Sequence, residues 1–176
     1  MVIDLRSDFV ARPTPEMVAA MARAAELPGG FGPREDATVA RLERLAADTL
    51  GLADALFCPT CTMANQIAIH LRCRPGEAFV TEAEAHVVTS ESAAPAALSG
   101  AMPKLVPAKG GALAIAAVEA ALTGADAQRA RVGLVVMENT HVRSGGTVLG
   151  LEHMAAIAEL ARVAGVPVHL DGARLF

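Results

Sequence analysis

The sequence contains no tryptophan and no tyrosine, and its three cysteines are crowded between residues 58 and 73. An odd, crowded cysteine set is poor material for the disulfide framework of a secreted domain. No apolar run approaches the roughly 20 residues of a membrane-spanning helix, and the start is charged where a signal peptide would be apolar. These absences favour a reducing, cytoplasmic location.

The charge of the chain bears on the class of partner that it binds. The formal net charge is −4, and the basic residues are scattered along all 176 positions. This pattern offers no electrostatic footprint for nucleic acid or for anionic lipid, so a small-molecule partner is favoured. A hydrophobic fraction of 53%, much of it alanine, predicts one domain rich in helices.

The order of apolar patterns predicts the fold class. Thr14 before Pro15 starts one helix, and Asp36 caps a second that ends near Gly51. The stripe expected to be buried in the second helix is Val39, Leu42, Leu45 and Thr49. Strands are expected at 54–58, 77–81, 103–107, 132–138 and 166–170, and helices at 62–73, 112–122 and 151–164. Such alternation predicts a three-layer α/β/α fold with a mostly parallel central sheet.

The turn before the helix at 62–73 carries small polar residues. Thr60, Cys61 and Thr62 stand where a helix offers free backbone N–H groups and the positive end of its dipole. The turn is therefore a candidate phosphate site, although an ordinary threonine cap would give the same pattern.

Two cysteine chemistries compete with this interpretation. Cys58 and Cys61 form a CxxC at a helix start, which is typical of thiol-disulfide oxidoreductases, but no tryptophan stands beside it. A zinc site would add His70 and Cys73, yet the helical rise separates Cys61 from His70 by roughly 13 Å. A single zinc ion is therefore not expected.

Polar residues follow several of the predicted strands. Asp171 and Arg174 follow the last strand, and His86 and His141 follow two earlier strands. Ligands bind at this edge of parallel sheets, where an aspartate can hold a proton on a ring nitrogen and histidines can transfer protons. Capping, salt bridges and solvation are the alternatives. The remaining histidines are expected to be structural: His70, His153 and His169.

Six motifs occur in one order along nearly the whole chain. They are DLRSD at 4–8, FG with EDATVARLE within 31–43, PTCTMANQIA at 59–68, AEAHVVTSES at 83–92, MENTH at 137–141 and HLDGARLF at 169–176. With them the chain resembles the threonine aldolase and aromatic amino acid beta-eliminating lyase family. The resemblance implies the fold-type-I architecture of pyridoxal 5'-phosphate (PLP) enzymes, that is, an aspartate aminotransferase-like large domain.

The resemblance also implies roles for individual residues. The cofactor phosphate would bind at Thr60, Cys61 and Thr62. His86 would stack on the pyridine ring, and Asp171 would pair with the ring nitrogen. The substrate carboxylate would bind at Ser7 and Arg174. Glu91 would be a polar contact beside the cofactor, and His141 would face the substrate hydroxyl, so that His86, His141 and Glu91 are the catalytic candidates. Two departures from the family pattern are Cys61 in place of glycine and Phe31 in place of tyrosine.

The resemblance places the Schiff-base lysine downstream of residue 176, and the only lysines here are Lys104 and Lys109. We therefore expect an N-terminal arm and helix at 1–35 and an incomplete PLP-binding large domain at 36–176, without its C-terminal part and small domain. The implied function is cleavage of a β-hydroxy-α-amino acid to glycine and an aldehyde by a homodimeric or homotetrameric parent, with the 176-residue chain alone inactive. Alternatives are a β-eliminating lyase, a thiol-disulfide oxidoreductase using Cys58 and Cys61, and a silent fragment with residual cofactor affinity.

Overall fold

The computed structural model describes residues 3–4, 6–32, 34–124 and 128–175. Leu5 of the first motif, Pro33 between the FG and EDATVARLE stretches, and Phe176 of the last motif therefore lie outside the described residues. The chain forms two compact units, Met1–Phe57 and Cys58–Phe176. Each unit is described by itself. This division does not test the predicted domain boundary between residues 35 and 36, which stays a prediction.

The first unit contains the two predicted helices. Its elements are the 3-10 helix η1 (Asp8–Val10) and the helices α1 (Pro15–Ala25) and α2 (Ala37–Leu50). Thr14 caps α1 by accepting a hydrogen bond from the backbone N–H of Met17, and Asp36 caps α2 through the N–H groups of the following residues. Gly51 ends α2 with a left-handed φ of 65°, which glycine adopts without a steric penalty. Both predicted helix starts are confirmed.

Two expectations for this region are wrong. In α2 the buried residues are Glu43 and Ala47, whereas Leu42 and Leu45 of the predicted stripe are 48% and 63% exposed. The run at 54–58 is not a strand. Both corrections have one cause, because the N–H of Phe57 donates to the Glu43 carboxylate at 2.8 Å instead of to a neighbouring strand. This bond draws the segment onto the Glu43 side of the helix, so the leucine side stays open.

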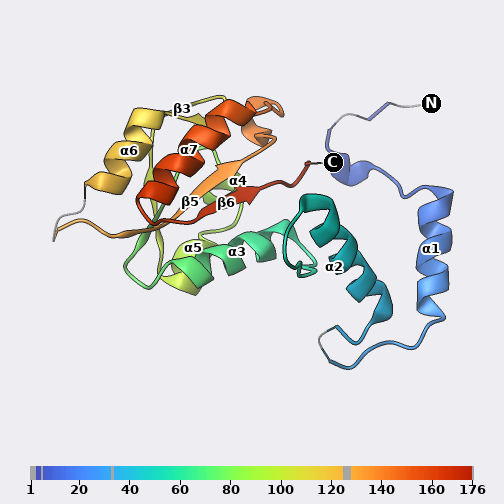
Figure 1. Cartoon of the computed structure of the whole chain (residues 1–176). Helices are drawn as coiled ribbons and strands as arrows, with labels where there is room; N and C mark the ends of the chain where they lie inside the picture. Colours follow the sequence, from blue (N-terminus) through green and yellow to red (C-terminus); the bar gives the residue numbers. More distant parts are fainter. Residues whose placement is uncertain (1–2, 5, 33, 125–127, 176) are drawn as a thin grey trace. The chain divides into compact units, whose positions relative to one another are not determined.

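The second unit is built around a four-stranded sheet, in the order β2-β1-β5-β6, with every neighbouring pair parallel (Figure 1). Its strands are β1 (Ala78–Thr81), β2 (Met102–Leu105), β5 (Val132–Glu138) and β6 (Val168–Asp171). Its helices are α3 (Cys61–Arg72), α4 (His86–Thr89), α5 (Ala94–Ser99), α6 (Ile115–Thr123) and α7 (Leu151–Val163), with the 3-10 turn η2 (Val142–Ser144). The predicted parallel sheet is confirmed.

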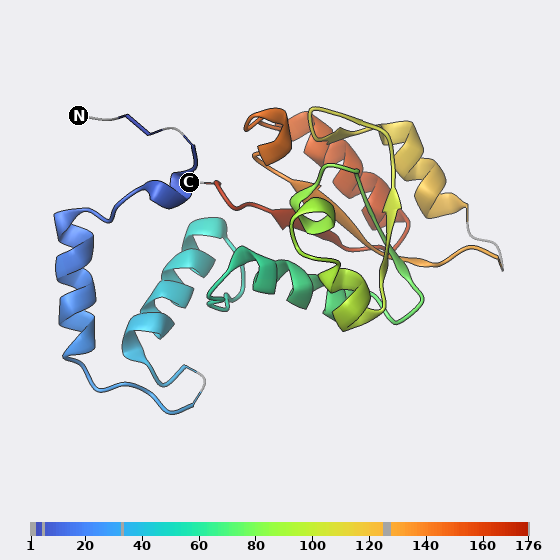
Figure 2. The ribbon, with the colours of Figure 1, turned by 180° about the vertical axis from the view of Figure 1, so that it is seen from behind.

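Helices cover both faces of this sheet, as the two opposite views show (Figures 1 and 2). Neighbouring strand residues point to opposite faces, so Phe79 packs in one core cluster with Ile69 of α3. Val80 packs in the other cluster with Val118 of α6 and Ile157 of α7. Every residue of β5 is buried, as expected for a central strand covered twice. The predicted three-layer architecture is confirmed.

Some short elements were not predicted. The helices α4 and α5 have four and six residues, too few to show a helical period. The hairpin of β3 (Ala108–Lys109) and β4 (Ala112–Leu113) has only two residues in each strand. Among the described residues, β6 pairs with β5 alone, so its outer edge is open.

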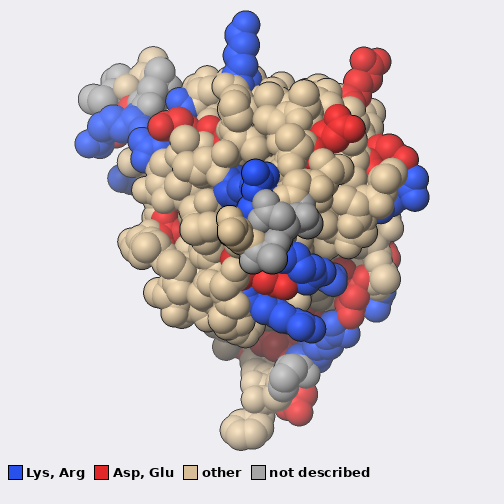
Figure 3. All heavy atoms as spheres, turned by 90° about the vertical axis from the view of Figure 1, so that its left-hand side faces the viewer, with Lys and Arg blue, Asp and Glu red and all other residues tan. Residues whose placement is uncertain are grey.

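The described surface carries both signs of charge. On the face drawn in Figure 3, basic and acidic side chains lie interspersed among uncharged ones, as the scattered charges of the sequence predict. Along the described stretches of the chain, no helix has the length and apolar character needed to cross a membrane.

Candidate active site

The polar residues of the second unit gather at the carboxyl edge of the sheet. Because all four strands are parallel, the segments that follow them meet at this edge. Glu82 follows β1, Glu138 ends β5 and Asp171 ends β6, and all three residues are buried. Buried carboxylates are costly unless they are hydrogen-bonded, so the partners of each one define the site.

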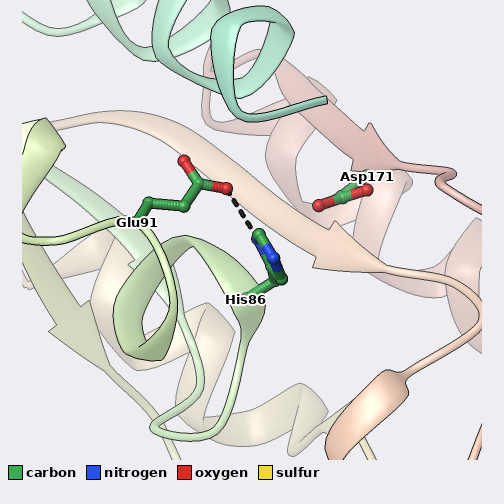
Figure 4. A group of neighbouring side chains, drawn as sticks. All are labelled: His86, Glu91 and Asp171. Carbon is green, nitrogen blue, oxygen red and sulfur yellow. Dashed lines mark hydrogen bonds and ion pairs between the residues drawn. The ribbon is translucent and has the colours of Figure 1, made fainter. Parts of the chain in front are cut away.

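Three predicted residues form one cluster (Figure 4). Nδ1 of His86, at the start of α4, lies 2.8 Å from a carboxylate oxygen of Glu91. Asp171 lies across from this pair, and one ligand atom of each of the three residues falls within 4.8 Å of the others. Among the described residues, these three side chains lie close enough together to hold a metal ion. The ligand atoms of Glu91 and Asp171 already accept hydrogen bonds within the chain, and the prediction of no metal stays a prediction.

A residue without a predicted role joins the cluster. Asn65, 2% exposed on α3, donates from Nδ2 to both Glu91 and Asp171 at 2.8 Å. Gln66 donates to the other oxygen of Glu91 at 2.6 Å. The sequence contained a signal for Asn65 and Gln66, which are two adjacent amides in the otherwise apolar segment MANQIA. Amide side chains that are buried in such a helix bind polar partners.

His169 extends the same network. Its Nε2 lies 2.7 Å from Oδ1 of Asn65, so the imidazole donates and the amide accepts. Burial lowers the pKa of His169 below 6.5, while the nearby charges of Asp171 and Glu91 act in the opposite direction. The structural role expected of His169 is therefore to fix the orientation of the Asn65 amide, which donates to Glu91 and Asp171.

Glu138 ties together the two loops that carry His86 and His141. One of its oxygens accepts from the backbone N–H of His86 at 2.7 Å, and the other accepts from the N–H of Val142 at 2.8 Å. A single buried carboxylate thus fixes the backbone beside both histidines. The sequence placed both histidines at one sheet edge, but it did not indicate this link.

His141 belongs to a second cluster. Its Nε2 lies 2.8 Å from Glu82, and its Nδ1 lies 2.8 Å from the hydroxyl of Ser144. The His141 side chain is buried, and Glu82 was not predicted to have a role. The predicted contact of His141 with substrate stays a prediction.

The turn before α3 has the geometry of a helix cap. The Thr60 hydroxyl accepts from the N–H of Met63 at 3.1 Å, as the alternative interpretation predicts. At the helix start Cys61 is exposed and Thr62 is half-buried. Their predicted contact with a phosphate stays a prediction.

The three cysteines differ in their surroundings. All three are free, with Cys58 half-buried, Cys61 exposed and Cys73 buried. Burial, assisted by the charge of Glu77, raises the pKa of Cys73 to about 11. The Cys73 thiol points to the carbonyl of Ala78.

The remaining predicted residues occupy separate places. Arg174 is exposed in the turn after β6, and the Asp171 carboxylate accepts from the N–H of Ala173 at the start of that turn. Ser7 belongs to the first unit, where its hydroxyl caps η1 by accepting from the N–H of Phe9. Phe31, in the same unit, is fully exposed. The roles predicted for Ser7 and Arg174 stay predictions.

A parallel sheet covered on both faces, with buried carboxylates and imidazoles at its carboxyl edge, is the large-domain architecture of fold-type-I PLP enzymes. Within that class, the chain belongs to the beta-eliminating lyase family, whose family model matches residues 4–176. The family resemblance expected from the motifs is therefore confirmed.

Individual relatives give the same result. The chain is 34% identical over 178 residues to the probable low-specificity L-threonine aldolase 2 of Arabidopsis thaliana, covering 99% of this chain and 50% of that protein. The threonine aldolase structure of Leishmania major aligns with a TM-score of 0.84 and 29% identity, covering 96% of this chain and 49% of that one. A serine palmitoyltransferase from S. paucimobilis with bound PLP, 22% identical with a TM-score of 0.64, covers 89% and 39% and shares the fold. The chain spans about half the length of the curated relatives it matches.

Proposed function

We propose that these residues form the N-terminal part of a PLP-dependent lyase that cleaves a threonine-like β-hydroxy-α-amino acid to glycine and an aldehyde. The observation that carries this proposal is the buried Asp171 carboxylate at the end of β6, held across from His86 in a chain of the beta-eliminating lyase family. Relatives named as threonine aldolases supply the substrate class. Residues 36–176 would be the first part of the PLP-binding large domain.

The donor set of the second unit fits the cofactor. PLP carries a phosphate, which suits the exposed N-terminus of α3, and a ring nitrogen, which suits a buried carboxylate. Both oxygens of Asp171 accept a hydrogen bond, from Asn65 and from Ala173, and each oxygen has a second lone pair left. Asp171 can therefore accept a further hydrogen bond from a ring nitrogen that carries a proton.

The bound cofactor would supply an electron sink for the carbanion formed when the bond between Cα and Cβ breaks. The residues of this chain would bind the cofactor and the substrate and would accept a proton. Asp171 would hold a proton on the ring nitrogen, and the His86 imidazole, whose Nδ1 contacts Glu91, would stack on the ring. His141 would take up the proton of the substrate hydroxyl, while Arg174 and Ser7 would bind the substrate carboxylate.

Within the same family, a β-eliminating lyase is the alternative reaction, because it uses the same sink and the same substrate carboxylate contacts. The thiol-disulfide reaction is less favoured, since the family match runs through the CxxC turn and on to residue 176. We further propose a cytoplasmic enzyme that acts on a small amino acid and assembles as a homodimer or homotetramer.

The test compares the 176-residue chain with the longest polypeptide encoded in frame with it, called here the extended chain. Each is mixed with PLP, reduced with borohydride, mapped for modified lysine and assayed for glycine release from threonine. We expect a single modified lysine and glycine release from the extended chain. The 176-residue chain should show neither, because Lys104 and Lys109 lie in no family motif.

Two substitutions make the test specific. Asp171→Ala in the extended chain should abolish glycine release and weaken PLP binding, because the ring nitrogen loses its anionic partner. Asp54→Ala, at an exposed carboxylate of the first unit, is the matched control and should change neither. Glycine release by the 176-residue chain, or an active Asp171→Ala variant, would contradict the proposal.

A further inference from the structure

Glu82 and His141 form a buried contact beside the residues to which the proposed function assigns roles. Glu82 is 7% exposed and His141 is 2% exposed. A carboxylate accepts hydrogen bonds, so in the 2.8 Å contact Nε2 of His141 is the donor and Glu82 the acceptor. The other Glu82 oxygen accepts from the N–H of Glu84 at 2.9 Å, which fixes the carboxylate.

The second ring nitrogen faces Ser144. The backbone N–H of Ser144 donates to Nδ1 at 3.3 Å, so Nδ1 presents its lone pair. The Ser144 hydroxyl lies 2.8 Å from the same nitrogen. Glu82 and Ser144 together therefore select one tautomer of His141, with the proton on Nε2 and the acceptor at Nδ1.

The imidazole cannot turn away from this arrangement. The β3–β4 hairpin packs against the ring, and a Cβ placed on Gly111 would come within 2.4 Å of Cγ of His141. Gly111 also has a φ of 84°, in the left-handed region. The backbone N–H of His141 donates to the carbonyl of Thr147 at 2.9 Å, which fixes the backbone of His141. Ser144, in contrast, is exposed.

From this geometry we propose that Glu82 is a positioning residue for His141 and that Ser144 is the exposed end of a three-residue proton relay. The inference rests on the proposed function and deepens it. The substrate hydroxyl gives its proton to Ser144 Oγ, and Ser144 passes its own proton to Nδ1 of His141. The imidazolium that results is stabilised by Glu82 through Nε2–H, and no group is oxidised or reduced.

The first experiment measures the tautomer and requires no turnover. Solid-state NMR of the extended chain with ¹⁵N-labelled histidine, with the His141 signal assigned by its loss in His141→Gln, should show protonated Nε2 and unprotonated Nδ1. Glu82→Leu removes the acceptor for Nε2–H, while the Ser144 N–H still donates to Nδ1, so the proton should stay on Nε2 and the ¹⁵N resonance of Nε2 should shift because its hydrogen bond is lost. Glu84→Gln, at the neighbouring exposed carboxylate, is the matched control and should leave that resonance unchanged.

The second experiment measures glycine release with PLP absorbance as the check on folding. Glu82→Gln keeps an acceptor for Nε2–H but loses the charge, so kcat should fall about 10- to 100-fold, the range found when the hydrogen-bond partner that orients a metal-bound histidine is replaced. The KM should stay within about twofold, because the imidazolium forms only during the reaction. Ser144→Ala should lower kcat while keeping the tautomer, and Glu82→Asp should recover part of the rate.

The outcomes separate the two proposals. A wild-type extended chain that releases no glycine contradicts the proposed function, whereas the tautomer experiment still tests the role of Glu82. An unchanged Nε2 resonance in Glu82→Leu, or an unchanged kcat in Glu82→Gln with intact PLP absorbance, overturns the positioning role. A Ser144→Ala variant with normal kcat overturns the relay through the hydroxyl.

Discussion

Asn65 is the position where a single substitution should disturb the site most, because one amide contacts two buried carboxylates and a half-buried imidazole. Its Nδ2 donates to Glu91 and to Asp171, and its Oδ1 accepts from His169. Asn65→Leu preserves the approximate volume of the side chain and removes all three hydrogen bonds. The two carboxylates then face each other without the shared donor.

The magnitude follows from the partners that remain. A hydrogen bond to a charged group contributes about 1.5–3 kcal/mol, and one between neutral groups about 1 kcal/mol, so the loss is about 4–7 kcal/mol. Glu91 keeps Gln66 and His86 as donors, Asp171 keeps Ala173, and the leucine gains about 1–2 kcal/mol by burial. We expect a net decrease of about 3 kcal/mol in the free energy of unfolding.

The measurement is urea unfolding of the extended chain, followed by far-ultraviolet circular dichroism. The matched variant is Gln66→Leu, which removes one bond to Glu91 and leaves Asp171 untouched, so it should cost about 1 kcal/mol. Leu71→Ala, at a position of α3 that is 71% exposed, should change the free energy by less than about 0.5 kcal/mol. The reasoning fails if Asn65→Leu matches the wild type or if Gln66→Leu costs more.

Three further predictions concern other parts of the chain. At pH 8 a thiol reagent should modify exposed Cys61 rapidly and Cys73 slowly, because burial raises the Cys73 pKa to about 11, and insulin should not be reduced; peptide mapping that finds Cys73 modified first would contradict this. Burial lowers the pKa of His169 from 6.5, so the unfolded state binds more protons and the unfolding free energy should fall as pH drops below about 6.5; His169→Gln should reduce that fall in urea titrations at pH 5.5 and 7.5. The 176-residue chain expressed alone should oligomerise nonspecifically through the open β6 edge, and a monodisperse monomer in size-exclusion chromatography would refute this.

The sequence by itself determined the layered fold and the family. Apolar runs such as 132–138 report burial on both faces, because a strand covered twice has no polar side. Local capping chemistry likewise fixed the helix starts at Thr14 and Asp36, since a cap depends on residues adjacent in the chain. The sequence placed His86 and Asp171 after predicted strands, and the structure brings them together because the ends of parallel strands meet at one edge.

Only the tertiary structure decided which polar groups share hydrogen bonds. Asn65 and Asp171 are 106 residues apart, and Glu82 and His141 are 59 apart, so no local pattern relates them. The same limit explains the exposed leucines of α2. An amphipathic period shows that a face is apolar, but burial depends on what packs there, and the Phe57 contact drew the chain to Glu43 instead. Pairing across long sequence separations is set by the packing of the sheet and its helices, which is information that residue order alone does not contain.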